Sequence, residues 1–145
     1  MENTMDNNEC QFCDPINRWP KSHIVGSLTS SVVLLSQDQY FHGWCLVVSK
    51  IHIVDLFDLS ISERAALEAD ACIVSKGIQK LFSPDIMNYA AFGNVIPHLH
   101  WNVMPRYKND GLWGAPPWPH EPKRLTEIEA GDLATLIREA TGARL

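Results

Sequence analysis

The stretch HLHWNVMPR, residues 98–106, has the alternating pattern of a β-strand with two different faces. Side chains alternate between the faces of a strand, so His98, His100 and Asn102 are expected on one side. The apolar residues between them are expected on the other side, where a helix can cover them. We therefore predict that the polar side lines a cleft, with Arg106 on the same side as the histidines.

Segments before this strand predict the rest of a sheet. Branched apolar residues predict strands over residues 30–36, from Trp44 onward, and over residues 86–92. The dipeptide Gly93-Asn94 predicts a turn just before the histidines. Backbone N–H groups in such a turn can bind an anion, so this turn is a candidate anion site beside the polar face.

Two helices are predicted from their capping residues. Ser60 and Glu63 have the spacing of a capping box, and apolar residues then recur at helical spacing until Pro84. This pattern predicts one amphipathic helix of roughly twenty residues. Thr126 and Glu129 repeat the capping-box spacing and predict a short C-terminal helix. The residues of that helix expected to face the core are Ile128, Leu133, Ile137 and Ala140.

The order of these elements predicts an α+β fold with a mostly antiparallel sheet, one long helix packed on it and a C-terminal helix. A chain of 145 residues is long enough for one domain with a real core and short for two. We expect a single domain over 1–145. Its parts are a core over 10–106, a Pro-, Gly- and Trp-rich tail over 107–124 and the C-terminal helix over 125–142.

Composition and charge limit the classes of function. A net charge of −5 disfavours binding to a nucleic acid polymer, because neutralising a phosphate backbone needs a basic face. No run of about 18 apolar residues occurs, so no membrane span is expected. The start MENTMDNNECQFC does not have the pattern of a secretory signal, which predicts a cytoplasmic protein with reduced cysteines. Cys45 and Cys72 lie in apolar segments and are expected to be buried.

The remaining cysteines and histidines leave several interpretations open. The CxxC pair Cys10 and Cys13 fits a redox pair, half of a zinc site or a coincidence. His98 and His100 fit a solvated sheet face, or two ligands of a catalytic metal that activates water. No acidic residue stands at convincing ligand spacing near them. The histidines without a partner spacing, expected at the surface, are His23, His42 and His120.

The segment GNVIPHLHWNVMPRY, residues 93–107, resembles the core motif of the histidine triad (HIT) superfamily of nucleotide hydrolases and transferases. In that motif histidines alternate with apolar residues and Pro-Arg commonly follows. The order of the other segments is also similar to that in the family: the CQFC start, the GWCLVVSKIHIVDLFDLS stretch and the capped helix. The combination of NYAAFGNVIPHLHW followed by WGAPPW resembles a bacterial branch of small HIT hydrolases. The resemblance covers most of the chain and implies a HIT-like sheet of about five strands.

The resemblance implies a covalent mechanism. The family's middle histidine, here His100, attacks the α-phosphorus of a nucleotide, and water then hydrolyses the nucleotidyl-histidine intermediate. Imidazole suits this role because it is neutral and nucleophilic near neutral pH. The implied substrates are purine nucleotide conjugates or dinucleoside polyphosphates. No catalytic metal is required, although Mg²⁺ can accompany polyphosphate substrates. Family members are usually homodimers, so a homodimer is expected.

Asn102 departs from the family pattern, which has a third histidine at this position. An amide donates a hydrogen bond but cannot act as a general acid near neutral pH. Phosphate binding can therefore survive while poor leaving groups lose assistance. The alternative to an active enzyme is a nucleotide-binding protein with weakened catalysis.

The resemblance also implies contacts to substrate and metal. Asn88 and Asn94 occupy roughly the places of phosphate-binding amides, Asp38 is a candidate partner of the ribose hydroxyls, and Arg106 completes the predicted substrate-binding set. Several bacterial HIT proteins have an N-terminal CxxC and a structural zinc. By position, the implied zinc ligands here are Cys10, Cys13, His52 and His98.

Overall fold

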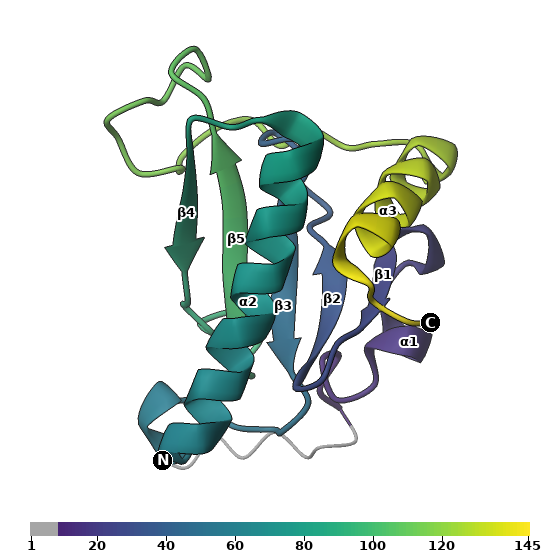
Figure 1. Ribbon diagram of the computed structural model, residues 1–145, viewed down its shortest axis with the longest axis vertical. Helices are drawn as coiled ribbons and strands as arrows, with labels where there is room; N and C mark the ends of the chain where they lie inside the picture. Colours follow the sequence, from purple (N-terminus) through teal and green to yellow (C-terminus); the bar gives the residue numbers. More distant parts are fainter. Residues whose placement is uncertain (1–8) are drawn as a thin grey trace.

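Five antiparallel strands form one sheet, in the order β1-β2-β3-β5-β4, in the computed structural model, which describes residues 9–145 (Figure 1). Residues 1–8, on which the expectation about an export signal partly depends, lie outside the described residues. The α+β class and the antiparallel sheet are confirmed. The strands are β1 (Ile24–Ser27), β2 (Ser31–Leu35), β3 (Cys45–Ser49), β4 (Ile86–Ala90) and β5 (His100–Arg106).

The two predicted helices are present and begin at the predicted caps. In helix α2 (Ile61–Phe82) the backbone N–H of Glu63 donates to Ser60 Oγ at 3.2 Å, and Ser60 N–H donates to the Glu63 carboxylate at 2.8 Å. Thr126 and Glu129 form the same reciprocal pair before α3 (Glu127–Thr141). No helix within residues 9–145 is long and apolar enough to cross a membrane. The shorter elements are α1 (Pro15–Arg18), η1 (Lys21–His23) and η2 (Leu56–Asp58).

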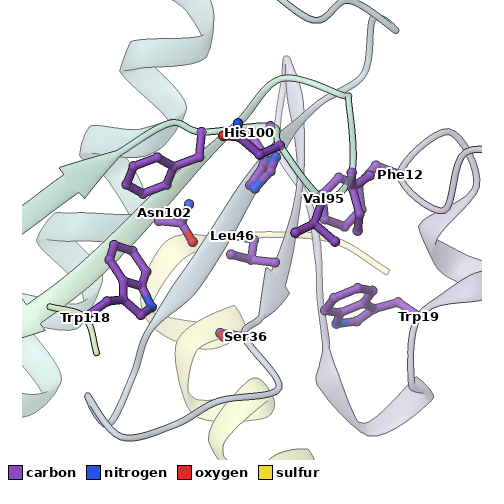
Figure 2. A pocket seen from close by; sticks show the side chains of 12 residues that line it. Phe12, Trp19, Ser36, Leu46, Val95, His100, Asn102 and Trp118 are labelled. Carbon is purple, nitrogen blue, oxygen red and sulfur yellow. The ribbon is translucent and has the colours of Figure 1, made fainter. Parts of the chain in front are cut away.

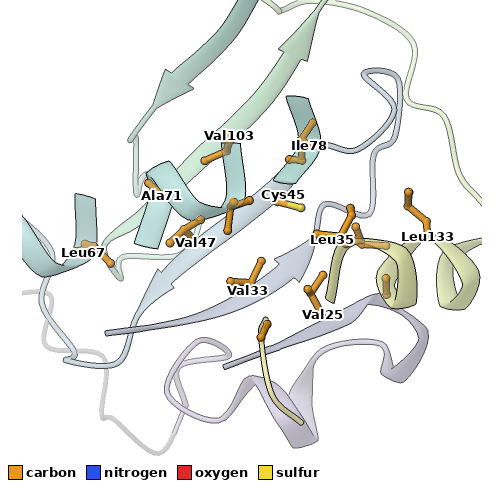
Figure 3. Close-up of a cluster of buried hydrophobic side chains, with 14 of the residues drawn as sticks. Val25, Val33, Leu35, Cys45, Val47, Leu67, Ala71, Ile78, Val103 and Leu133 are labelled. Carbon is orange, nitrogen blue, oxygen red and sulfur yellow. The ribbon is translucent and has the colours of Figure 1, made fainter. Parts of the chain in front are cut away.

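Helices α2 and α3 cover one face of the sheet and enclose the main core (Figures 1 and 3). Val33, Val47 and Val103 project from three neighbouring strands into this core. From α3 the buried residues are Ala130, Leu133, Ala134 and Ile137. The expectation for Ile128 is wrong, because it lies five residues before Leu133, about 140° around the helix, and is exposed.

The opposite face of the sheet is covered in part by the N-terminal segment. Leu34, Leu46 and Val48 point to this side and pack with Phe12 and Trp19 in a second, smaller apolar cluster. Val48 pairs with His100 across the sheet, and directly paired residues share a face. The N-terminal segment therefore lies beside the strand that carries the histidines.

Three further expectations about burial are wrong. Cys72 is exposed, because it follows Ala71, which faces the core, and lies about 100° further around α2. His23 is buried, and the side chain of His120 is only 4% exposed because it binds Asp38. Cys45 is buried, as expected.

Candidate active site

Strand β5 presents its two faces to different surroundings. Leu99, just before the strand, and Val103 are buried in the main core beneath the helices. His100 and Asn102 point to the other face, opposite Val48 and Leu46. The predicted alternation is therefore correct, and it directs two polar side chains to the face that the helices leave uncovered.

His100 and Asn102 line a cavity of about 500 Å³ (Figure 2). Its walls come from distant parts of the chain: Phe12 and Trp19 from the N-terminal segment, and Trp118 from the tail. Asn94 also lies in the lining, in the loop between β4 and β5, and its contact with a phosphate remains a prediction. The other lining residues are Ser36, Leu46, Phe92, Gly93, Val95 and Ile96. A mostly apolar cavity with a few polar groups at one wall is typical of a small-molecule site.

The orientation of the His100 ring is fixed by the backbone. Its Nδ1 lies 2.8 Å from the carbonyl oxygen of His98, and a carbonyl only accepts, so Nδ1 carries the proton. Nε2 then has a lone pair, and none of the described residues bonds to it. Burial lowers the pKa of His100 below its usual value, although the hydrogen bond to His98 acts in the opposite direction. The ring is thus held as a neutral imidazole whose Nε2 lone pair is free of bonds from the described residues.

Asn102 is held at both ends of its amide. The indole N–H of Trp44 donates to Asn102 Oδ1 at 3.2 Å, and Asn102 Nδ2 donates to the carbonyl oxygen of Ala90 at 3.1 Å. Trp44 is itself buried. The amide therefore has one orientation, with its oxygen occupied by the indole.

Cys10, Cys13, His52 and His98 form a compact cluster, with their ligand atoms within 4.8 Å of one another. Nδ1 of His98 lies 3.4 Å from Cys10 Sγ, 3.7 Å from Cys13 Sγ and 3.1 Å from His52 Nδ1. Tetrahedral zinc with ordinary bond lengths requires S···N and N···N separations of about 3.6 and 3.3 Å. The spacing of the cluster fits such an ion.

The surroundings of the cluster also suit a cation. His98 Nε2 lies 2.7 Å from the carbonyl oxygen of Ser49, so this nitrogen carries the proton and Nδ1 is left as a ligand atom. Burial and the adjacent Cys10 raise the pKa of Cys13 to about 11, so metal binding would release a proton from this thiol. Phe12 stands between the two cysteines in the sequence, and its ring centroid lies 4.9 Å from the ring centroid of His100.

Arg106 and Asn88 lie together, away from the cavity lining. All five guanidinium N–H groups of Arg106 are used, and one donates to Asn88 Oδ1 at 2.9 Å. The remaining acceptors are the Asp110 carboxylate and the carbonyl oxygens of Leu112 and Ala115. These bonds hold the start of the tail against the sheet. Substrate contacts by Arg106 and Asn88 remain untested predictions, and the function proposed below does not depend on them.

Asp38 is likewise bonded within the protein. Its Oδ2 lies 2.6 Å from His120 Nε2, and its Oδ1 accepts from the backbone N–H groups of Tyr40 and Lys123. This network ties the tail to the loop after β2, close to Trp118. Contact of Asp38 with a ribose remains a prediction. The cavity walls Phe12 and Trp19 were not predicted, since no local pattern connects them with the histidines.

The Arg106–Asp110 pair predicts a pH-dependent stability. Burial acts to raise the pKa of Asp110, but hydrogen bonds from Arg106 and from backbone N–H groups hold this pKa below its usual value. The carboxylate therefore stabilises the fold above the unfolded-state pKa of about 3.9, and this contribution is lost as the pH falls through the lower folded-state value. Asp110→Asn should lower the free energy of unfolding by about 3 kcal/mol at pH 7, because the buried Arg106 loses its ion-pair partner.

Urea unfolding of the wild type and of Asp110→Asn between pH 3 and pH 7 measures this effect. The stability difference between the two proteins should be constant near neutrality and shrink below about pH 4. Asp132→Asn, on the exposed side of α3, is the matched control and should change little. A difference that stays constant down to pH 3 would contradict the assignment.

Comparison with known proteins identifies relatives over most of the chain. Residues 18–109 match the HIT domain family. "Adenylylsulfatase HINT3" of Arabidopsis thaliana is 27% identical over 143 residues, which cover 95% of this chain and 72% of that protein. A histidine triad protein from Marinobacter aquaeolei is 28% identical and superposes with a TM-score of 0.76, over 83% of this chain and 88% of its own. A Zn-bound histidine triad family protein from Mycobacterium smegmatis shares the fold, with 21% identity and a TM-score of 0.70 over 94% and 95% of the two chains.

Proposed function

The chain belongs to the HIT family, and we propose that it cleaves nucleotides at the α-phosphate through a covalent intermediate on His100. Its substrate class is a purine nucleotide that carries a leaving group on the α-phosphate, or a dinucleoside polyphosphate. The acceptor is water in a hydrolase and another nucleophile in a transferase. The name of the Arabidopsis relative makes adenosine 5′-phosphosulfate a suitable first assay substrate.

One observation carries this proposal: His100 Nδ1 donates to the His98 carbonyl while the ring lines the cavity. The Nε2 lone pair then forms a bond to phosphorus, and the bond from phosphorus to the leaving group breaks with its electron pair. Water attacks phosphorus in a second step, the pair of the N–P bond returns to Nε2, and the proton that the water loses goes to the solvent. Phe12, Trp19 and Trp118 offer aromatic surfaces for the nucleobase.

Trapping the intermediate tests this proposal. After mixing with adenosine 5′-phosphosulfate and quenching in alkali, peptide mass spectrometry should locate one nucleotidyl group on His100. Hydrolysis of a substrate with a chiral α-phosphorothioate in H₂¹⁸O should give retention at phosphorus, because two inversions occur. Inversion without an adduct would mean direct attack by water and would overturn the covalent mechanism.

We further propose that Cys10, Cys13, His52 and His98 hold a structural zinc ion. The support is the spacing of their ligand atoms and the fixed tautomer of His98. Bound zinc would tie the N-terminal segment to the strands and would leave His100 free. The alternative in which His98 and His100 share a catalytic metal fits less well, because both nitrogens of His98 already face Ser49 O and the cysteine cluster.

A nucleotide-binding protein without turnover is the second candidate, and Asn102 favours it. Tight binding of nucleotide with no adduct and no product, combined with turnover in Asn102→His, would establish this alternative. The expected homodimer remains a prediction that sedimentation velocity can check.

A further inference from the structure

The fixed amide of Asn102 limits what this position can do for a substrate. An indole N–H only donates and a carbonyl oxygen only accepts, so the bonds from Trp44 and to Ala90 define which end of the amide is oxygen and which is nitrogen. The nitrogen carries a second N–H, for which residues 9–145 supply no acceptor. Asn102 lines the cavity, and a bound phosphate can take this hydrogen bond.

Trp44 keeps this orientation. It is 4% exposed, and aromatic rings of Phe41 and Trp118 lie against it, with centroids 6.2 and 5.5 Å away. The indole therefore cannot turn away without disturbing its neighbours. If it were absent, the amide could rotate and present its oxygen, which would repel a phosphate.

Within residues 9–145, no group that lines the cavity is suited to protonate a leaving group. Of the described residues that line it, His100 is the only one with an ionisable side chain, and it is the nucleophile. An amide does not supply a proton near neutral pH. Asp55 is absent from this lining and lines a neighbouring hollow of about 230 Å³, which shares Phe92, Gly93 and His100 with the cavity. A departing group must therefore leave without a proton.

We infer that the site selects nucleotides whose leaving group departs as a stable oxyanion, such as sulfate, a carboxylate or a condensed phosphate. Amines and alkoxides are disfavoured, because they need a proton as their bond to phosphorus breaks. Asn102 donates to the α-phosphoryl oxygen, and Trp44 is a positioning residue that acts through the amide. This inference rests on the proposed function. In the step, Nε2 of His100 forms the bond to phosphorus, and the oxyanion leaves with the electron pair of the P–O bond.

Two substrates with the same nucleotide, adenosine 5′-phosphosulfate and adenosine 5′-phosphoramidate, test the selectivity. The readout is the ratio of their kcat/KM values. When this ratio is compared between wild type and a variant, the intrinsic reactivity of each compound cancels. Asn102→His, which restores a possible acid, should shift the ratio toward the phosphoramidate by about 10²–10⁴-fold. Asp55→Asn is the matched control and should leave the ratio unchanged.

A double-mutant cycle tests the role of Trp44. Trp44→Phe should lower kcat/KM for the phosphosulfate by about 3- to 10-fold, the effect of one hydrogen bond. In an Asn102→Ala background the same replacement should change kcat/KM by less than about 2-fold, because Trp44 acts through the missing amide. Equal losses in both backgrounds would mean that Trp44 is merely structural and would overturn its positioning role.

Wild-type protein alone gives a further test if a variant does not fold. Across adenosine 5′-aryl phosphates with phenols of graded acidity, kcat/KM should fall steeply as the phenol becomes less acidic. Three results would overturn the selectivity and leave the His100 mechanism standing. They are a kcat/KM that does not change along the phenol series, a substrate ratio that Asn102→His does not shift, and a substrate ratio that Asp55→Asn does shift. Absence of both turnover and adduct with every substrate would overturn the proposed function itself.

Discussion

Replacing His100 by alanine should lower kcat for nucleotide hydrolysis by at least about 10⁴-fold, because the covalent route loses its nucleophile. The dissociation constant of a nucleoside monophosphate should change much less. The aromatic walls of the cavity and the Asn102 amide remain in the variant. Single-turnover kinetics and calorimetric titration with AMP measure the two quantities separately.

His42→Ala is the control for this replacement. His42 is exposed, does not line the cavity and contacts Phe82, with ring centroids 5.0 Å apart. It should retain turnover and form the adduct. Full activity in His100→Ala would contradict the mechanism, and loss of activity only on chelation, without an adduct, would favour the metal-activated alternative.

The parts of the fold that sequence reasoning predicted depend on local patterns. Ser60 and Thr126 begin their helices because each satisfies a backbone donor three residues later. The alternation along β5 separates His100 from Val103 because a strand has two faces. These features need only residues that are neighbours along the chain.

Strand β1 was missed because its pattern is interrupted. Gly26 lies in the middle of this four-residue strand, where the register with β2 shifts. Its φ is +148°, and a Cβ at this position would lie 2.9 Å from the carbonyl oxygen of Arg144. The glycine is required by a contact with the end of the chain, which a local pattern does not contain.

In the site, too, local sequence patterns placed some residues, and contacts between distant parts of the chain could not be predicted from them. His100 and Asn102 were placed correctly on one face by their spacing. The walls of the cavity come from Phe12 and Trp118, which are 106 positions apart in the numbering and meet only in the folded chain. Asp38 and His120 also pair across a long separation. Only the resemblance to a family connected Cys10 with His98, and the structure brings these two residues together.

Removing the metal should destabilise the protein and weaken nucleotide binding together. Zinc that is present at about a thousand times its dissociation constant stabilises a fold by about 4 kcal/mol. For a chain of this length, that loss corresponds to a fall in Tm of at least about 8 °C. Protein purified without chelator should contain one zinc per chain by elemental analysis. Chelation, or the double replacement Cys10→Ser with Cys13→Ser, should produce the fall in Tm.

Cys72→Ser is the matched control, because this thiol is exposed and lies outside the cluster. It should leave both zinc content and Tm unchanged. Nucleotide affinity should fall with the metal because Phe12, between the two cysteine ligands, lines the cavity and packs against His100. Zinc content and Tm are measured without turnover, so they test the metal site even if the catalytic proposal fails. Metal-free protein with an unchanged Tm would show that hydrogen bonds and apolar packing alone hold the N-terminal segment against the sheet.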